Sequence, residues 1–214
     1  MVGPGDRTRI HDHGSFDGLV CRGLGHHTLR TGYRCCAKPL FAAADLAHRA
    51  ISLAQLSGNR FLLGIGAGST EADFKAFERN FTHRFKRFNA MAPVLRDYLQ
   101  QGSSGEVALS PWPTIRGRVT LLLGSWGAGV EQAAGQFDGW IASGQYRNPP
   151  EIHVALDRYR AAGGQRAIVS TIILNRKTDI GELRDLLQGF AAAGFDDAVV
   201  ISSHRRHILT ACER

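Results

Sequence analysis

The stretch that decides the fold runs from Leu56 to Gly68 and reads LSGNRFLLGIGAG. An alanine-rich segment, residues 40–56, ends there at a Ser-Gly-Asn sequence that is typical of a helix terminus. The apolar run 61–65 follows between turn-forming residues, as expected for a strand that is buried on both faces. A glycine-rich turn then leads into another helical segment. The stretch therefore predicts a helix, a buried strand and a turn in succession.

The same succession recurs along the chain. Apolar runs at 119–123, 139–142, 167–174 and 198–201 predict four more strands, and helical patterns at 130–136, 151–162 and 179–193 lie between them. Before residue 102, five phenylalanines three or four positions apart predict one long helix with an apolar face turned to the core: Phe74, Phe77, Phe81, Phe85 and Phe88. Strands that alternate with helices predict right-handed crossovers and a parallel sheet, so we expect one α/β domain over residues 40–214.

The first 39 residues do not follow this pattern. They show no sustained periodicity, and residues 1–36 contain four of the nine histidines and three of the four cysteines. The first hundred residues carry 14 Lys and Arg against 8 Asp and Glu, whereas the rest of the chain carries 12 against 11. We expect residues 1–39 to form an irregular or disordered N-terminal segment, in which 18–21 is the one candidate for a short strand.

The composition excludes several classes of protein. Of the 214 residues, 43% are hydrophobic and 21% are charged, which is ordinary for a globular domain. No apolar run approaches the roughly 18–20 residues of a membrane span, and the start lacks the apolar segment of a secretory signal. Four cysteines are too few for a disulfide scaffold. We therefore expect a cytoplasmic protein with no membrane partner.

Two further readings of the charged and metal-ligating residues are weaker. The N-terminal histidines and cysteines match no zinc-binding spacing, so we expect no metal site. Basic residues among the phenylalanines, at Arg79, Arg84, Lys86 and Arg87, suggest a nucleic-acid surface. However, phenylalanines that share one helical face are typical of a core, and we expect no nucleic-acid partner.

The loops that follow the strands are the best candidates for a binding site. In parallel α/β folds, ligands bind beyond the carboxyl ends of the strands, which here means loops 64–70, 124–129, 143–148 and 202–206. The first two are glycine-rich and open a helix, where close backbone approach and free amides favour an anion. This predicts a phosphate-bearing cofactor. The spacing GxGxG differs from the dinucleotide fingerprint GxGxxG, so the motif alone is weak.

Three segments together resemble the luciferase-like flavin-dependent oxidoreductases. LSGNRFLLGIGAG is similar to the family's LSGGRFxLGxGxG signature, and the phenylalanines with Arg84 resemble its EFxAFGxxFxxRxxRxxE helix. The segment from Leu123 to Gly127, followed by Ala133-Ala134 and Asp138-Gly139-Trp140, resembles its GG…A…ADGW segment. The resemblance covers about residues 40–203.

The resemblance implies a (β/α)8 TIM-barrel-like fold that binds FMN or the deazaflavin coenzyme F-420 at its carboxyl-terminal face. It implies an oxidoreductase that acts on a small organic substrate, as a monooxygenase with O₂ or by deazaflavin-dependent hydride transfer. Loop 124–128 would hold the flavin phosphate, and segment 64–68 would lie near the isoalloxazine or the substrate. The cofactor-binding residues expected on this basis are Gly64, Gly66, Ala67, Gly68, Gly124, Ser125, Trp126, Gly127, Ala128 and Ser143.

The chain also departs from the family pattern. The family begins with two βα units that residues 1–39 do not reproduce, and Asn89 stands where the family often has glutamate. We therefore expect an incomplete barrel in which the first two βα units are missing or replaced. No acid–base pair can be assigned; His204, after the last strand, is the best-placed lone histidine. An alternative is a degenerate, non-enzymatic barrel that binds a flavin phosphate, or nothing. In either case a homodimer would cover the open sheet edge.

Overall fold

The computed structural model describes residues 18–22, 30–37, 41–109 and 116–202. Seven strands form a closed barrel in the order β1-β2-β3-β6-β7-β8-β9. These strands are β1 (Gly18–Arg22), β2 (Arg30–Ala37), β3 (Phe61–Gly66), β6 (Thr120–Gly124), β7 (Gly139–Ser143), β8 (Ala167–Leu174) and β9 (Asp197–Ser202). The helices are α1 (Ala43–Leu56), α2 (Glu71–Ala76), α3 (Arg84–Gln101), α4 (Gly129–Gln136), α5 (Pro149–Ala161) and α6 (Ile180–Ala193). A two-stranded hairpin, β4 (Ser103–Ser104) and β5 (Val107–Ala108), follows α3.

Neighbouring strands from β2 to β9 pair in parallel, in chain order. Strand β1 is different, because it pairs antiparallel with both β2 and β9 and so closes the sheet. The expected α/β barrel, incomplete and with its first units replaced, is confirmed. The five strands and the helices predicted between residues 40 and 203 are present within a few residues of their expected bounds, apart from the long phenylalanine helix.

The N-terminal expectation needs a correction. Strands β1 and β2 lie inside the segment 1–39, for which we expected irregular or disordered structure, and only the possible strand at 18–21 was foreseen. Backbone pairing with β3 and β9 orders these residues, and such pairing leaves no side-chain periodicity to detect. Because every strand of the barrel has two neighbours, the sheet has no open edge of the kind that motivated the expected homodimer. The domain boundary at residue 39 stays a prediction.

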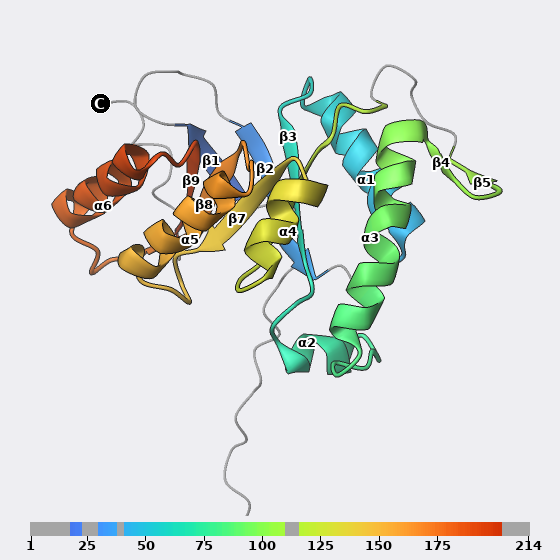
Figure 1. Cartoon of the computed structure of the whole chain (residues 1–214), viewed down its shortest axis with the longest axis horizontal. Coiled ribbons are helices and arrows are strands. Elements are labelled where there is room, and N and C mark those ends of the chain that lie inside the picture. Colours follow the sequence, from blue (N-terminus) through green and yellow to red (C-terminus); the bar gives the residue numbers. More distant parts are fainter. Residues whose placement is uncertain (1–17, 23–29, 38–40, 110–115, 203–214) are drawn as a thin grey trace, which may run out of the picture.

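Alternating side chains divide the core into two layers. Inside the barrel, one apolar cluster joins residues from five strands: Leu62, Leu122, Ile141, Ile168 and Val199. The residues next to them in each strand point outward, and they pack against the helices in the main core cluster with Trp140, which is fully buried. Figure 1 shows α1 and α3 next to each other at the right of the barrel, α5 and α6 at the left, and α4 between the two pairs. Among the described helices, none combines the length and hydrophobicity that crossing a bilayer requires.

The phenylalanine stripe is divided between two helices and their connection, because Phe77 and Phe81 lie between α2 and α3. Glu78 adopts a positive φ of 53°, and the amide of the next residue donates to the carbonyl of Phe74 at 2.7 Å, which ends α2. Phe74 and Phe88 are buried as expected, but Phe77 and Phe85 are 48% and 58% exposed. The expectation of one long helix with five core phenylalanines is therefore wrong, because the backbone turn at Glu78 breaks the shared face.

Gly139 provides a test of how tightly the barrel is packed. A Cβ atom at this position would lie 2.6 Å from Cδ2 of Leu122 and 2.7 Å from the carbonyl oxygen of Arg166. We expect Gly139→Ala to lower the free energy of unfolding by about 1–3 kcal/mol in urea denaturation, because the backbone has to move. The control is Gly135→Ala on α4, where a Cβ atom would meet nothing within 4 Å. Because alanine favours a helix more than glycine does, this substitution should raise the free energy of unfolding by up to about 1 kcal/mol. Equal effects at the two positions would contradict the packing argument.

Tyr159 predicts a loss of stability at alkaline pH. Its ring is buried beside Trp140, and its hydroxyl donates to the carbonyl of Arg166 at 2.8 Å. Burial raises the pKa of the Tyr159 phenol above its ordinary value of about 10, although nearby hydrogen bonds partly oppose this shift. Because the folded state holds this proton more tightly, its stabilising contribution is present below pH 10 and falls as the pH rises through the raised pKa. We expect Tyr159→Phe to flatten the alkaline fall in the urea midpoint, and an unchanged slope would argue against this assignment.

Candidate functional site at the mouth of the barrel

Near the carboxyl ends of four strands, the inward positions of the barrel carry small side chains. The apolar cluster described above forms a floor, and the inward positions nearer the carboxyl ends of the strands are Gly66 of β3, Gly124 of β6, Ser143 of β7 and Ser170 of β8. These positions alternate with outward residues in each strand, so they share the inner face. These small residues lie at the carboxyl-terminal mouth, the end at which parallel barrels bind their ligands, and Ile201 of β9 packs against the same interior cluster.

Loop 125–128, between β6 and α4, offers free backbone donors at this mouth. Within the described residues, the amides of Trp126, Gly127 and Ala128 donate to no protein acceptor. They directly precede α4, whose N-cap residue Ala128 makes no side-chain cap hydrogen bond. Consecutive free amides at a helix N-terminus form a binding site for an anion such as phosphate.

Several contacts hold this loop in shape. The hydroxyl of Ser125 donates to the carbonyl of Gly129 at 2.6 Å, and the indole of Trp140 donates to the carbonyl of Ser125 at 3.2 Å. From α5, Arg158 donates to the carbonyl of Gly127 at 3.1 Å. The Ser125 hydroxyl is therefore used within the loop, and the backbone is the part of the loop that is available to a ligand.

Charged side chains of both signs surround loop 125–128. Arg158 pairs with Glu131 in the first turn of α4 at 2.6 Å. The pKa of the Glu131 carboxyl lies below its ordinary value, first because it accepts a hydrogen bond from its own backbone amide and then because Arg158 faces it. This shift is the effect expected of the positive end of a helix. Arg147, after β7, lies 4.6 Å above the ring of Trp126 and also approaches Glu151 at 3.8 Å. The loop therefore has two guanidinium groups beside its free amides.

The other predicted glycine-rich segment lies next to this loop in the barrel. Strands β3 and β6 are neighbours, and Gly64 pairs with Leu122 in register. Gly64 and Gly66 are buried at inward positions of β3, whereas Ala67 packs against the outer core and Gly68 turns the chain with a φ of 84°. The structure thus brings both predicted glycine loops to the same end of adjacent strands.

A bulge in β8 adds hydroxyl groups that sequence reasoning missed. Ser170 pairs with Ser143 of β7, and the register of β8 then shifts between Val169 and Ile172. Thr171 occupies this shift with a φ of 63°, and its hydroxyl lies 3.3 Å from that of Ser170. The side-chain oxygen of Ser143, a predicted site residue, is buried and has no partner among the described residues. The one sequence signal for this feature was a Ser-Thr pair inside the apolar run 167–174.

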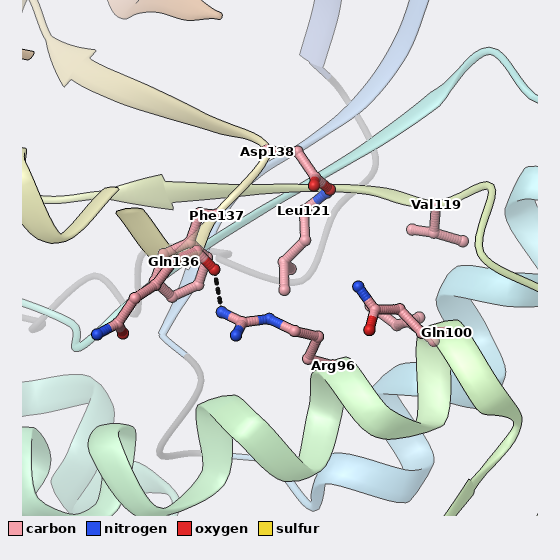
Figure 2. A pocket seen from close by; sticks show the side chains of 8 residues that line it. Arg96, Gln100, Val119, Leu121, Gln136, Phe137 and Asp138 are labelled. Carbon is pink, nitrogen blue, oxygen red and sulfur yellow. Dashed lines mark hydrogen bonds between the residues drawn. The ribbon is translucent and has the colours of Figure 1, made fainter. Parts of the chain in front are cut away.

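A pocket between α3 and the start of β7 lies at the opposite end of the barrel. Figure 2 shows Arg96 reaching from α3 to donate to the carbonyl of Gln136, with its guanidinium 5.3 Å from the Phe137 ring centroid. The pocket borders Asp138, whose carboxylate accepts from the amide of Leu121 at 2.7 Å. These contacts cap the C-terminus of α4 and the amino end of β6, so we read the pocket as part of the scaffold.

The remaining sequence alternatives gain no support from the described residues. No group of three or more described His, Cys, Asp or Glu side chains has metal-binding geometry. All of the N-terminal histidines and cysteines lie outside the described residues or the described side chains, so the expectation about them stays untested. His204 also lies outside the described residues. On α3, Arg84 lies 3.9 Å and 4.4 Å from the ring centroids of Phe81 and Phe85. Two of the rings interleaved with the basic residues therefore contact the protein's own guanidinium group.

Thr171 gives a test of strain at this mouth. A β-branched residue at positive φ costs on the order of 1–2 kcal/mol, and asparagine tolerates this conformation far better. We expect Thr171→Asn to raise the free energy of unfolding by about 1 kcal/mol in urea denaturation. The control, Thr120→Asn at the amino end of β6, should lower stability because asparagine is unfavourable in an ordinary strand. Destabilisation by Thr171→Asn would show that the bulge carries no strain.

Comparison with known proteins identifies the family. The luciferase-like monooxygenase family model matches residues 27–171. Among solved structures, monooxygenase RslO1 from Streptomyces bottropensis has a TM-score of 0.57 at 18% identity, covering 77% of this chain and 55% of its own. Apo-MsnO8 has a TM-score of 0.52 at 21% identity, covering 78% and 54%.

These likenesses show the shared fold, and the chain spans about half the length of both solved structures. No curated relative matches the chain. The family match covers loops 64–70 and 124–129 together with Ser143 and the β8 bulge, which are the features that build the mouth. The chain belongs to the luciferase-like monooxygenase family.

Proposed function

We propose that the protein binds a flavin at the carboxyl-terminal mouth of its barrel and acts as a flavin-dependent oxidoreductase of the monooxygenase type. The observation that carries this proposal is the set of three unpartnered amides, Trp126 to Ala128, at the N-terminus of α4. A flavin phosphate is an anion of the size and charge that such a loop accepts. Membership of the family, together with the sequence motifs of this loop, supports the choice of a flavin over other phosphates.

The residues of the mouth fit the rest of such a cofactor. The inward glycines Gly64, Gly66 and Gly124 leave space above the apolar floor, where a planar ring system has apolar side chains beneath it. Ala67 and Gly68 continue into the neighbouring loop, and Ser143 presents a buried hydroxyl without a partner. A reduced flavin supplies the electrons for activation of O₂ or for hydride transfer, and the protein's part is to bind, orient and shield it.

The finer assignments rest on the resemblance of the sequence. FMN and the deazaflavin F-420 both carry the phosphate that loop 125–128 would bind, so both remain candidates, with a small organic molecule as the second substrate. We also propose a reducing cytoplasmic location, in keeping with the few cysteines. The alternative is a barrel that binds the flavin phosphate, or nothing, without catalysis; the lack of an assigned acid–base pair does not decide between the two, because in flavin enzymes the cofactor carries the chemistry.

Gly127 allows the phosphate site to be tested. Gly127 has a φ of 63°, and Gly117, in the connection before β6, has a φ of 71°; in both cases an added Cβ would meet nothing within 4 Å. Alanine should therefore strain the backbone to a similar extent at either position. We expect Gly127→Ala to weaken FMN binding about tenfold or more, because the strained loop no longer presents its amides together. Gly117→Ala should leave binding unchanged while lowering stability by a similar amount.

The measurement is fluorescence titration with FMN, F-420 and riboflavin, which lacks the phosphate. The affinity of Gly127→Ala for riboflavin should stay close to that of the unsubstituted protein. Equal losses for FMN and riboflavin would contradict the phosphate assignment, and failure of the unsubstituted protein to bind either phosphorylated cofactor would reject the proposed function. Bound flavin without NAD(P)H- or O₂-dependent turnover would favour the non-catalytic alternative.

A further inference from the structure

We propose that the connection between α2 and α3, together with the first turn of α3, binds the surface of an anionic lipid bilayer. This basic–aromatic surface consists of two exposed phenylalanines and four cations: Phe77, Phe85, Arg79, Arg84, Lys86 and Arg87. None of these residues is among those proposed to bind the flavin. The inference is therefore independent of the proposed function.

The exposed rings border one aromatic cluster instead of lying singly. Phe77 and Phe85 are 48% and 58% exposed, although the sequence pattern predicted both in the core. The centroid of the Phe77 ring lies 6.1 Å from that of Phe41, which packs against the fully buried Phe74. Phe81 lies against the same buried ring, at 5.2 Å between centroids. Apolar side chains that gather at a protein surface in this way indicate an interaction site.

The four cations of this surface have no anionic partner. Among the described residues, no ion pair joins any of them to a carboxylate. Residues 79–87 contain these four cations, one histidine and no acidic residue. The acidic residues of the preceding segment 71–78 are Glu71 and Glu78, which are exposed, and Asp73, which is buried. The rings are therefore flanked by unpaired positive charge, which is complementary to an anionic partner.

The start of α3 increases this positive potential. A helix N-terminus carries a partial positive charge, and acidic residues are the favourable ones in its first turn. The first turn of α3 has no acidic residue, and its N-cap residue His83 makes no side-chain cap hydrogen bond. Arg84, Lys86 and Arg87 add to the helix dipole where carboxylates would oppose it. This distribution is unfavourable in the free protein and becomes favourable when the surface meets an external anion.

The mixture of side chains favours a bilayer over other anionic partners. Nucleic-acid stacking needs ring faces that are open to bases, whereas Arg84 lies 3.9 Å and 4.4 Å over the rings of Phe81 and Phe85. Protein interfaces are depleted in lysine. On membrane-surface helices, phenylalanine enters the boundary of the acyl chains while Lys and Arg contact anionic headgroups. The expectation of no membrane partner concerned spanning segments, which a peripheral contact does not require.

The basic–aromatic surface lies at the same end of the barrel as loop 125–128. Helix α2 begins five residues after the carboxyl end of β3, and Figure 1 shows α3 running back from there beside the barrel. Loop 125–128 follows the carboxyl end of β6, which is the parallel neighbour of β3. Contact through Phe77 and Phe85 therefore brings the carboxyl-terminal end of the barrel close to the bilayer.

Co-sedimentation of the full chain with large unilamellar vesicles tests the proposal. Vesicles of phosphatidylcholine are compared with vesicles that contain about one third phosphatidylserine. We expect the unsubstituted protein to bind the anionic vesicles at least about tenfold more tightly than the neutral ones. Raising the salt from about 0.1 M to about 0.5 M should weaken this binding, because the headgroup charges are then screened.

Four substitutions separate the contributions of charge and of the rings. Arg79→Gln and Lys86→Gln each remove one exposed cation and should each weaken vesicle binding about fivefold. Phe77→Ala and Phe85→Ala each remove one exposed ring and should weaken binding about five- to tenfold, because less apolar area leaves water.

Matched controls lie on the other side of the molecule. Val154→Ala on α5 shortens a side chain that is 62% exposed, and Arg184→Gln on α6 removes an exposed cation. Both should leave vesicle binding unchanged. Thermal unfolding identifies the variants that fold; because Phe77 and Phe85 lie in different segments, either ring variant carries the test if the other does not fold.

Each result decides for or against this surface. The proposal is overturned if the unsubstituted protein does not bind anionic vesicles, or if the controls weaken binding as much as the four variants do. Salt-sensitive binding that survives loss of the rings also rejects it, because the protein then adsorbs through charge alone. Binding of a single-stranded oligonucleotide or of polyglutamate without vesicle binding would assign the surface to another partner. FMN titration of the same variants should show unchanged affinity, and failure of FMN binding with vesicle binding intact rejects only the flavin function.

Discussion

The antiparallel strand β1 is the element on which the rest of the structure depends. Six parallel strands, β2 to β9, curl around a common interior but need one more strand between the two ends. Strand β1 pairs with β2 on one side and β9 on the other, so the backbone donors and acceptors at both ends of the parallel series gain partners. Unpaired edges would expose these groups or invite association with other chains. Closure also fixes the ring of inward positions that defines the floor and the mouth.

The polar contacts at the two ends of the barrel can be compared directly. At the amino end, carboxylates bind strand amides directly: Asp138 accepts from Leu121 at 2.7 Å, and Asp196 accepts from Ala167 at 2.8 Å. Nearby, the buried Asp197 pairs with Arg166. The two carboxylates that accept from strand amides help hold the strand starts in register. Among the described residues, polar atoms without a protein partner occur at both ends: Oδ1 of Asp197 and Nε of Arg166 at the amino end, and the amides of loop 125–128 and the Ser143 hydroxyl at the carboxyl end.

Much of the fold could be predicted because its strands are buried on both faces and therefore read as apolar runs. The loop at 124–128 could be predicted for the same reason, since glycine at the end of a buried strand signals a turn into a helix. Strands β1 and β2 escaped prediction because their order comes from backbone pairing across long sequence distances. The exposure of Phe77 and Phe85 escaped it because a single turn at Glu78 breaks the helical period, and glutamate gives no warning of a positive φ. The bulge at Thr171 was hidden in an apolar run whose composition is that of an ordinary strand.

The proposed binding site is built from neighbouring elements of the barrel. The phosphate loop and the hydroxyl group come from three consecutive strands, β6, β7 and β8, which are adjacent both in sequence and in the sheet. Each βα unit therefore positions its own part of the site through contacts with its immediate neighbour, as Arg158 of α5 does for the loop before α4. A site of this kind requires a closed barrel. It does not depend on which strands and helices form the side of the barrel opposite β6, β7 and β8. The proposed cofactor site therefore depends on contacts among the units of β6, β7 and β8 and on closure of the barrel by β1.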